Sequence, residues 1–287
     1  MVIGATIGMF DGVHKGHRYL ISQLKEHCDE AVVVTIENHP RWVVTGKREP
    51  RLLTTAEEKT RLLSELGVRP IVMRFDERLR RLTAQEFVEK LSREAGVTRL
   101  VLGFNNNIGS DRLGATEDEK LKASTGVEIV RATELPGEET VNSSKIRALL
   151  CEGEVEAAAR LLTRTYTIEG EVGHGKALGR TIGYPTANIE VGGADKLLPQ
   201  IGVYAADVAT ESGSIYRGVV NIGRRPTVAQ GDAPVTIEAY IDGFSGDLYG
   251  TTLRVAFLRK LRGEMKFADL TQLQSAIAQD VKTAREV

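Results

Sequence analysis

The sequence predicts an α/β protein in two parts: a Rossmann-like domain with a parallel sheet, then a small antiparallel β-barrel that ends in a helix. Two observations carry this prediction. In the first half, short apolar runs alternate with helical patterns, an order typical of a parallel sheet with helices on both faces. In the second half, every second residue is apolar within short segments that are separated by glycines and prolines. This pattern is typical of antiparallel barrels.

Apolar runs in the first half predict the strands of the parallel sheet, at residues 2–7, 31–36, 70–75, 99–104 and 127–132. After the first of them, a helical stripe of apolar residues is formed by Leu20, Ile21, Leu24 and Cys28. Helix starts are predicted by two capping-box sequences, Thr55 with Glu58 and Thr83 with Glu86. Ligands of such sheets bind at the carboxyl ends of strands, often against helix N-termini.

The second half changes character from about Tyr166. Residues 235–242 predict a strand with one apolar face, formed by Val235, Ile237, Ala239 and Ile241. A C-terminal helix is predicted by a stripe of apolar residues, namely Leu270, Leu273, Ile277 and Val281, with Asp269 and Gln272 as its cap. The helical stretch 154–162 is then the connection, and we expect domains at 1–163 and 164–287.

The composition excludes several classes of protein. The chain has 287 residues, 41% hydrophobic and 27% charged, which is typical of a globular protein. A formal net charge of −1 gives no electrostatic case for nucleic acid. Two isolated cysteines are too few for a disulfide framework or a thiolate metal site. With no signal-like opening and no long apolar run, we expect a cytoplasmic protein without membrane contact, either a monomer or a weak homo-oligomer.

The stretch "TIGMFDGVHKGHRYLI", residues 6–21, places His14 and His17 between a glycine-containing turn and a predicted helix. A strand, a turn and a helix in this order hold phosphate, because the helix N-terminus offers unpaired N–H groups and a partial positive charge. The remaining histidines have no zinc-ligand spacing with this pair, which disfavours a zinc site. Taken alone, the pair also fits two surface histidines near a helix start.

The stretch "VNSSKIRALL", residues 141–150, brings hydroxyl groups and a cation to a second helix start, through Ser143, Ser144 and Arg147. Alone, it fits an ordinary N-cap followed by a solvated arginine. Together, the two stretches match the H-x-G-H and S/T-S/T-x-x-R motifs of the nucleotidyltransferase superfamily. The stretch "GMFDGVHKGH" closely resembles the opening of the prokaryotic bifunctional riboflavin kinase/FMN adenylyltransferase family.

This resemblance implies adenylyl transfer, in which the phosphate of FMN attacks the α-phosphorus of ATP. It implies ATP contacts from Gly8, Phe10, Asp11, His14, His17, Ser143, Ser144 and Arg147. Among these, His14, His17 and Arg147 would be catalytic, with Mg²⁺ assisting. Flavin contacts are implied for Asn38, in the "ENHP" stretch with His39 and Pro40, and for Asn105 in "GFNNNIGSDRLG". Phosphate is already a nucleophile, so the demand is for positioning and charge neutralisation.

This half departs from the pattern of the family. Asn106 and Ile108 replace aromatic residues that are usual there, and Asn142, Ser144 and Lys145 differ from the commoner Ser-Ser-Thr-Arg form. The departures leave open a weak adenylyl activity or a different acceptor.

The stretch "GEVGHGKALGRTIGYPTANIEV", residues 170–191, is rich in glycine and on its own fits a flexible hairpin. With "GYPTAN" intact, it strongly resembles the riboflavin kinase domain. The resemblance implies that Thr186 and Asn188 are ligands of metal and phosphate, and that Gly175 and Gly179 lie near the nucleotide. His174 receives no role.

Glu238, in "TIEAY", fits a solvated strand carboxylate by its pattern alone. The ribityl hydroxyl of riboflavin is a poor nucleophile whose proton must be taken during attack, and the family's glutamate on this strand is that base. By the same resemblance, Arg262, Glu264 and Phe267 lie near the flavin. The stretches "VVNIGRRPT", "GDLYG" and "LRGEMKF" extend the resemblance over essentially the whole chain.

The sequence therefore predicts an enzyme that phosphorylates riboflavin to FMN and adenylylates FMN to FAD, with ATP as co-substrate and Mg²⁺ as cofactor. Three alternatives stay open at this point. One is a riboflavin kinase with a weak or repurposed nucleotidyltransferase domain, and another is a nucleotidyltransferase with a different acceptor. The last is a flavin- or nucleotide-binding regulator without turnover.

Overall fold

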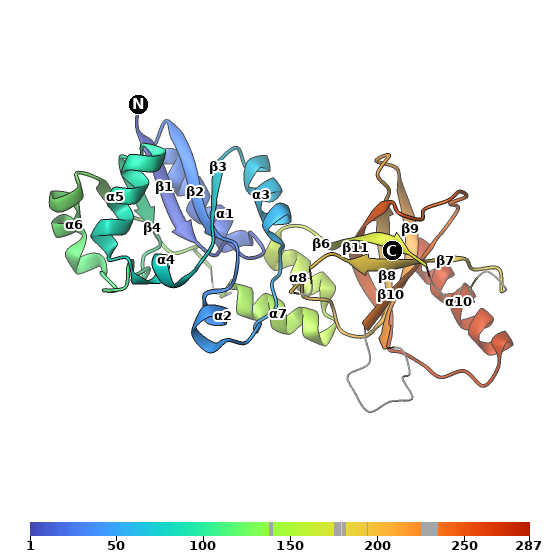
Figure 1. Ribbon diagram of the computed structural model, residues 1–287. Coiled ribbons are helices and arrows are strands. Elements are labelled where there is room, and N and C mark those ends of the chain that lie inside the picture. Colours follow the sequence, from blue (N-terminus) through green and yellow to red (C-terminus); the bar gives the residue numbers. More distant parts are fainter. Residues whose placement is uncertain (138–139, 175–178, 180–181, 194, 225–234) are drawn as a thin grey trace. The chain divides into compact units, whose positions relative to one another are not determined.

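The chain forms two compact units, Met1–Ser143 and Ser144–Val287. The structure is a computed structural model that describes residues 1–137, 140–174, 179, 182–193, 195–224 and 235–287 (Figure 1). The units divide at residues 143 and 144, whereas the boundary predicted from the sequence lies after residue 163. That boundary stays a prediction about the functional domains.

The first unit contains a five-stranded sheet of order β3-β2-β1-β4-β5, in which every pair is parallel. Its strands are β1 (Ile3–Gly8), β2 (Glu30–Ile36), β3 (Arg69–Met73), β4 (Arg99–Leu102) and β5 (Glu128–Arg131). The predicted parallel sheet is confirmed. The strand order reverses at β1, which has β2 on one side and β4 on the other. The carboxyl end of β1 is therefore the place where such sheets bind ligands.

Helices cover both faces of this sheet (Figure 1). The helices of this unit are α1 (Lys15–Glu26), α2 (Pro40–Thr45), α3 (Ala56–Glu65), α4 (Glu77–Arg81), α5 (Ala84–Ala95) and α6 (Asp118–Thr125), with a short 3₁₀ turn at Ala115–Glu117. Of these, α2 and α4 are short and bury no residue. Successive strand residues point to opposite faces, so β2 serves two cores. Val32 packs in a cluster with Phe87 of α5, whereas Val33 packs with Ile21 of α1 and Leu63 of α3.

Both predicted capping boxes are present, at Thr55 with Glu58 and at Thr83 with Glu86. The Glu86 amide donates to the Thr83 hydroxyl at 3.2 Å, and the Glu86 carboxylate accepts from the Thr83 amide at 2.8 Å. We expect Thr83→Ala to lower the free energy of unfolding by about 1 kcal/mol, because α5 loses its cap. Urea unfolding measures this effect. Thr83→Ser keeps the hydroxyl and should retain most of the stability, so equal losses in both variants would contradict the capping role.

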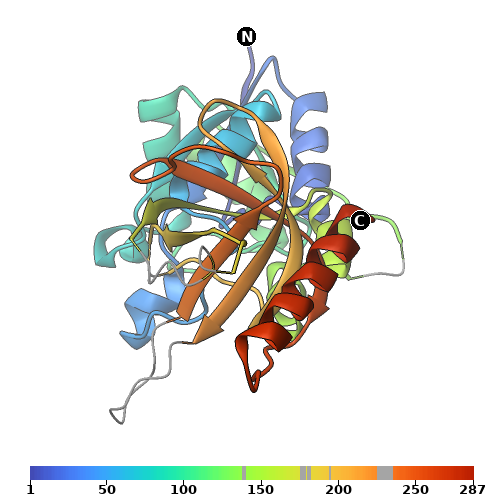
Figure 2. The same ribbon diagram turned by 90° about the vertical axis from the view of Figure 1, so that its right-hand side faces the viewer.

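The second unit is a closed antiparallel barrel of order β10-β7-β6-β11-β8-β9, with helix α10 along one side (Figure 2). Its strands are β6 (Tyr166–Gly173), β7 (Thr186–Val191), β8 (Gly202–Ala209), β9 (Ile215–Arg224), β10 (Val235–Ile241) and β11 (Thr252–Arg262). The helices are α7 (Ser143–Glu152), α8 (Val155–Leu162) and α10 (Leu270–Arg285). The predicted barrel and its C-terminal helix are confirmed.

Strand β10 has the predicted alternation. Ile237, Ala239 and Ile241 are buried, whereas Val235 at the start of the strand is exposed. Helix α10 packs on the barrel through its later turns, where Val281 joins a cluster with Val203 and Val219. Leu270 was also expected on the apolar stripe, but it is exposed because it begins the helix, before the turns that meet the barrel.

Candidate active sites

The loop after β1 is held by buried polar contacts. The Asp11 carboxylate is 1% exposed and accepts from the backbone amides of Leu53, at 2.9 and 3.1 Å, and Thr54, at 3.0 Å. The Thr54 hydroxyl in turn accepts from the amide of Gly12 at 3.0 Å. Phe10 is buried with φ of 46°, a left-handed conformation that costs energy in a non-glycine residue. Asp11 therefore anchors a strained loop, and its predicted contact with ATP stays a prediction.

Lys59, from α3, lies beneath the same loop. Its side chain is fully buried and its ammonium donates to the carbonyl of Met9 at 2.9 Å and to the carbonyl of Ile36. These carbonyls lie at the carboxyl ends of β1 and β2. Burial lowers the pKa of Lys59 to about 8, against the opposing effect of Asp11. The sequence analysis did not predict a role for Lys59, because the apolar pattern of a helix does not show that a lysine is buried.

His14 and His17 form a stacked pair at the start of α1. Their ring centroids are 3.6 Å apart with 16° between the planes, and Nδ1 of His14 caps the helix by accepting from the His17 amide at 3.3 Å. The ring of Phe10 packs on His17 at 4.9 Å. Gly16 leaves room for the stack, because a Cβ there would lie 3.3 Å from the His14 ring, closer than an ordinary contact.

The pKa of His17 lies well below its ordinary value because the ring is buried, with smaller effects from His14 and Lys59. His17 is therefore neutral near neutral pH. Its Nδ1 atom is buried and has no hydrogen-bond partner among the described residues. A buried polar atom without a partner at a helix N-terminus is suited to a ligand, and a phosphate group fits this position.

We expect the stability of the first unit to fall as the pH drops below about 6.5. The unfolded chain takes up a proton on His17 near that pH, whereas the folded chain keeps the ring neutral, so acid favours unfolding. Above about pH 6.5, His17 is neutral in both the folded and the unfolded chain, so its contribution to stability is fully present. Urea midpoints measured between about pH 7.5 and 5.5 test this. His17→Phe should lose less stability over that range, and an equal loss would assign the effect to other groups.

Ser143, from the stretch "VNSSKIRALL", contacts the loop after β1. Its hydroxyl donates to the carbonyl of Asp11 at 2.9 Å. Both residues belong to the first unit. Ser144 and Arg147 belong to the second unit, at the start of α7, so their approach to the phosphates stays a prediction.

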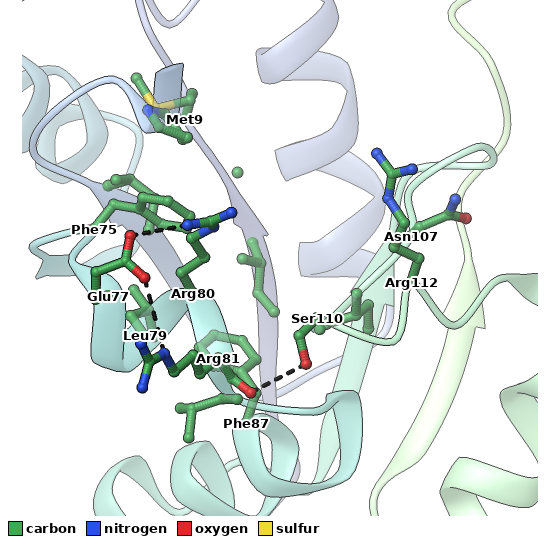
Figure 3. Close-up of a pocket in the computed structure, with 17 residues that line it drawn as sticks. Met9, Phe75, Glu77, Leu79, Arg80, Arg81, Phe87, Asn107, Ser110 and Arg112 are labelled. Atoms are coloured by element: carbon green, nitrogen blue, oxygen red, sulfur yellow. Dashed lines mark hydrogen bonds and ion pairs between the residues drawn. The ribbon is translucent and has the colours of Figure 1, made fainter. Parts of the chain in front are cut away.

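A pocket of about 930 Å³ lies at the carboxyl ends of β1 and β2 (Figure 3). Gly8 of the β1 end lines it, as does Phe75. Figure 3 shows Phe75 and Arg80 on one wall and Asn107 and Arg112 on the opposite wall. Arg80 and Arg81 pair with Glu77, at 2.9 and 3.9 Å. Within a mostly apolar lining, two phenylalanines and three arginines offer aromatic rings and positive charge, which suits a flat anionic ligand.

The two predicted flavin residues of this half do not line the pocket. Asn38 binds the backbone of Phe75 twice, accepting from its amide at 2.8 Å and donating to its carbonyl at 2.9 Å, so Asn38 positions a pocket residue. Asn105 is exposed, whereas Asn107 and Ile108 line the pocket. The sequence analysis did not predict Phe75, which lies in no motif, and it singled out Asn105 in the stretch 103–114 where Asn107, two residues later, lines the pocket.

The second unit has a pocket of about 210 Å³ between the barrel and α10. Six residues predicted from the sequence line it, namely Gly179, Thr186, Glu238, Arg262, Glu264 and Phe267. Asn221, Tyr184, Tyr240 and Asp280 line it as well, and the sequence reasoning had not singled them out. Gly175 lies outside the described residues.

Glu238 stands between two amide side chains on the barrel face. It is directly opposite Asn188 of β7 and Asn221 of β9. Opposed residues of antiparallel strands have Cβ atoms about 5 Å apart and point to the same face. Thr186, two residues before Asn188, shares that face. The fold therefore brings the predicted base and the predicted metal ligands together.

The wall of this pocket is fixed by Arg262, which binds buried Asp280 of α10 through Nη2 at 2.8 Å and Nε at 3.1 Å. Its guanidinium lies 5.7 Å from the ring centre of Phe267. Glu264 approaches Gly223 so closely that a Cβ there would lie 2.3 Å from its carboxylate. The three residues predicted to lie near the flavin are thus held on one wall.

The donor set suits Mg²⁺. Thr186 and Asn188, the two predicted ligands, offer hydroxyl and amide oxygens, which are hard donors of the kind that this ion binds, and Glu238 stands beside them as the predicted base. Within the described residues, no group of three or more His, Cys, Asp or Glu side chains could hold a metal ion. Mg²⁺ usually binds one or two protein ligands together with substrate phosphates, and this barrel face fits that mode.

In the part of the chain that the structure describes, no helix combines the length and the apolar character needed to cross a membrane.

Both cysteines, Cys28 and Cys151, are free thiols.

The fold and the two sites define a two-domain transferase. A profile of the FAD synthetase family matches residues 3–146, and a profile of the riboflavin kinase family matches residues 162–287. The bifunctional riboflavin kinase/FMN adenylyltransferase of Pseudomonas fluorescens is 38% identical to this chain, over 98% of this chain and 91% of its own length. The Escherichia coli K12 enzyme of the same name is 36% identical over the same shares. The chain belongs to this bifunctional family.

The fold also agrees with a crystal structure from Streptococcus pneumoniae, described as a macrolide-efflux protein. The similarity covers 100% of this chain and 94% of that chain, with a TM-score of 0.90 and 29% sequence identity.

Proposed function

We propose that this chain phosphorylates riboflavin to FMN in its second unit and adenylylates FMN to FAD in its first, with ATP as the donor in both steps. The observation that carries this proposal is the barrel pocket. There, Glu238 stands between Asn188 and Asn221, and six residues predicted for a flavokinase share one lining.

In the kinase step, the 5′-hydroxyl of riboflavin attacks the γ-phosphorus of ATP and ADP leaves. Glu238 takes the proton of that hydroxyl during the attack, which makes the poor nucleophile competent. Thr186 and Asn188 would hold Mg²⁺, which would neutralise charge on the phosphates. Phe267 and Arg262 line the pocket where the flavin is bound.

In the adenylyl step, the phosphate of FMN attacks the α-phosphorus of ATP and pyrophosphate leaves. No strong base is needed, so the chain supplies positioning and charge neutralisation. Neutral His17 donates a hydrogen bond to a phosphate oxygen from the N-terminus of α1, beside His14. Ser143, Ser144 and Arg147 bind the same phosphates.

The acceptor of the adenylyl step occupies the 930 Å³ pocket of the first unit. Gly8 lines that pocket and ends the strand that leads into the histidine loop, so acceptor and donor meet there. The aromatic residues that the family has at positions 106 and 108 are absent from this chain. Phe75 contributes an aromatic side chain to the wall of the pocket. An aromatic side chain in the wall of this pocket supports FMN as the acceptor and disfavours the kinase-only alternative.

The non-catalytic alternative is not favoured, because a binding protein has no use for a carboxylate base opposite two amides. We further propose that the enzyme works in the cytoplasm as a monomer or weak homo-oligomer, without nucleic acid. Its functional domains would span 1–163 and 164–287.

One assay tests the proposed function. Purified protein is incubated with riboflavin, Mg²⁺ and ATP, and the flavins are separated by chromatography. We expect both FMN and FAD. FMN alone would confine activity to the barrel, and neither product would overturn the proposal.

A further inference from the structure

Arg131, the last residue of β5, joins two segments at the carboxyl end of the sheet of the first unit. Its guanidinium donates to both carboxylate oxygens of Asp118, the first residue of α6, from Nη2 at 2.6 Å and from Nε at 2.7 Å. From Nη1 it donates to the backbone carbonyls of Asn106, at 2.6 Å, and Gly103, at 3.4 Å. One side chain therefore ties the loop after β4, residues 103–114, to α6.

The ion pair makes this link rigid. Only 18% of the Arg131 side chain and 17% of the Asp118 side chain are exposed, so salt and water screen the pair weakly. Two parallel N–H···O bonds fix the plane of the guanidinium, and its remaining nitrogen is then directed at the loop. Asp118 lies in the first turn of a helix, where the partial positive charge of the N-terminus favours a carboxylate. A lysine has no such fork and cannot hold both partners in this way.

The other end of this loop is fixed on the side of α4 and α5. The Ser110 hydroxyl donates to the carbonyl of Arg81 at 3.0 Å (Figure 3). The Asp111 carboxylate accepts from the backbone amide of Ala84 at 2.9 Å. The loop is thus held at two places, by Arg131 near β4 and by these contacts near the start of α5.

Asn107 and Ile108 lie between the two attachment points and line the pocket that we assign to the acceptor. Arg131 is not among the described residues that line this pocket, so it acts through the loop. We propose that Arg131 is a positioning residue of the adenylyl step, which holds Asn107 and Ile108 in the wall against which FMN binds. A loop without this link samples more conformations, and FMN must then order it on binding at a cost in affinity. This inference rests on the proposed adenylyl function of the first unit.

The test compares Arg131→Met with wild type in the full-length protein. Methionine keeps an unbranched side chain but has no donor for Asp118 or for the loop. With FMN and ATP as substrates, we expect the KM for FMN to rise about tenfold, while the KM for ATP and kcat stay near their wild-type values. Phosphorylation of riboflavin, measured on the same preparation, should not change. Arg131→Lys keeps the charge without the fork and should restore only part of the affinity for FMN.

Arg99→Met is the matched control. Arg99 donates from Nε to the Glu128 carboxylate at 2.9 Å, so it forms an ion pair at the opposite, amino end of β5, outside the lining of the pocket. Its replacement should lower the melting temperature to a similar extent but leave the KM for FMN unchanged. Hydrogen–deuterium exchange of residues 103–114 adds a measurement that needs no turnover. Exchange of that loop should be faster in Arg131→Met and unchanged in Arg99→Met.

Two results would overturn the role of Arg131. One is an unchanged KM for FMN in folded Arg131→Met. The other is an equal rise of that KM in Arg99→Met, which would mean a general loosening of the unit. If Arg131→Met does not fold, the KM for FMN of Arg131→Lys decides between the same outcomes. If wild type forms no FAD from supplied FMN, the proposed adenylyl function fails, while the exchange of residues 103–114 still tests whether Arg131 holds the loop.

Discussion

Glu238→Gln should stop the formation of FMN from riboflavin while leaving the conversion of supplied FMN to FAD intact. The amide is nearly the same size as the carboxylate and keeps the place opposite Asn188 and Asn221, but it takes no proton from the ribityl hydroxyl. Loss of a general base lowers the rate by about 10²- to 10⁴-fold. Initial rates with riboflavin and with FMN, measured separately on one preparation, give the two effects.

The matched control for this variant is Glu171→Gln. Glu171 is an exposed carboxylate of β6, outside the lining of the pocket, and its replacement should leave both rates unchanged. Retained phosphorylation in Glu238→Gln would remove Glu238 from the role of base. Loss of both activities in a folded protein would contradict the assignment of two separate sites.

Local patterns predicted the elements of this fold well. The strands of the sheet and both capping boxes depend on residues close together in the chain, and the structure confirms them. Helices α2 and α4 have six and five residues, too few to show an apolar period, and the sequence did not indicate them. Leu270 was wrongly placed on the buried stripe, because periodicity alone does not show where a helix first meets its partner.

The sites were predictable only where a motif carried them. Six residues that the family resemblance predicted for the kinase site line one pocket. Asp280 and Phe75 contribute to the two pockets from segments that show no such motif. Lys59 is polar and buried because two strand ends offer it carbonyls, a fact that depends on tertiary contacts. Residues of this kind emerge only when the fold is known.

For His14 and His17, the structure reduces the number of roles that the motif leaves open. The sequence left zinc, phosphate and surface positions open for His14 and His17. In the structure, Nδ1 of His14 accepts from a backbone amide, and the rings stack instead of converging on one point. Burial keeps His17 neutral, so the contribution that we propose for it in phosphate binding is a hydrogen bond and not a full positive charge. The positive charge must then come from other groups, and Arg147 is the candidate that the motif provides.

His17→Ala should lower FAD formation by about 10²- to 10³-fold while FMN formation stays at its wild-type rate, because one donor to the transferring phosphates is lost. The ring also packs on His14 and Phe10, so its removal leaves a gap that alone disturbs the loop. His17→Phe fills that gap without a donor, and it should lose FAD formation to the same extent while melting near the wild-type temperature. His27→Ala, at the other end of α1, should change neither rate. If His17→Phe kept its FAD activity, packing and not hydrogen bonding would be the role of His17.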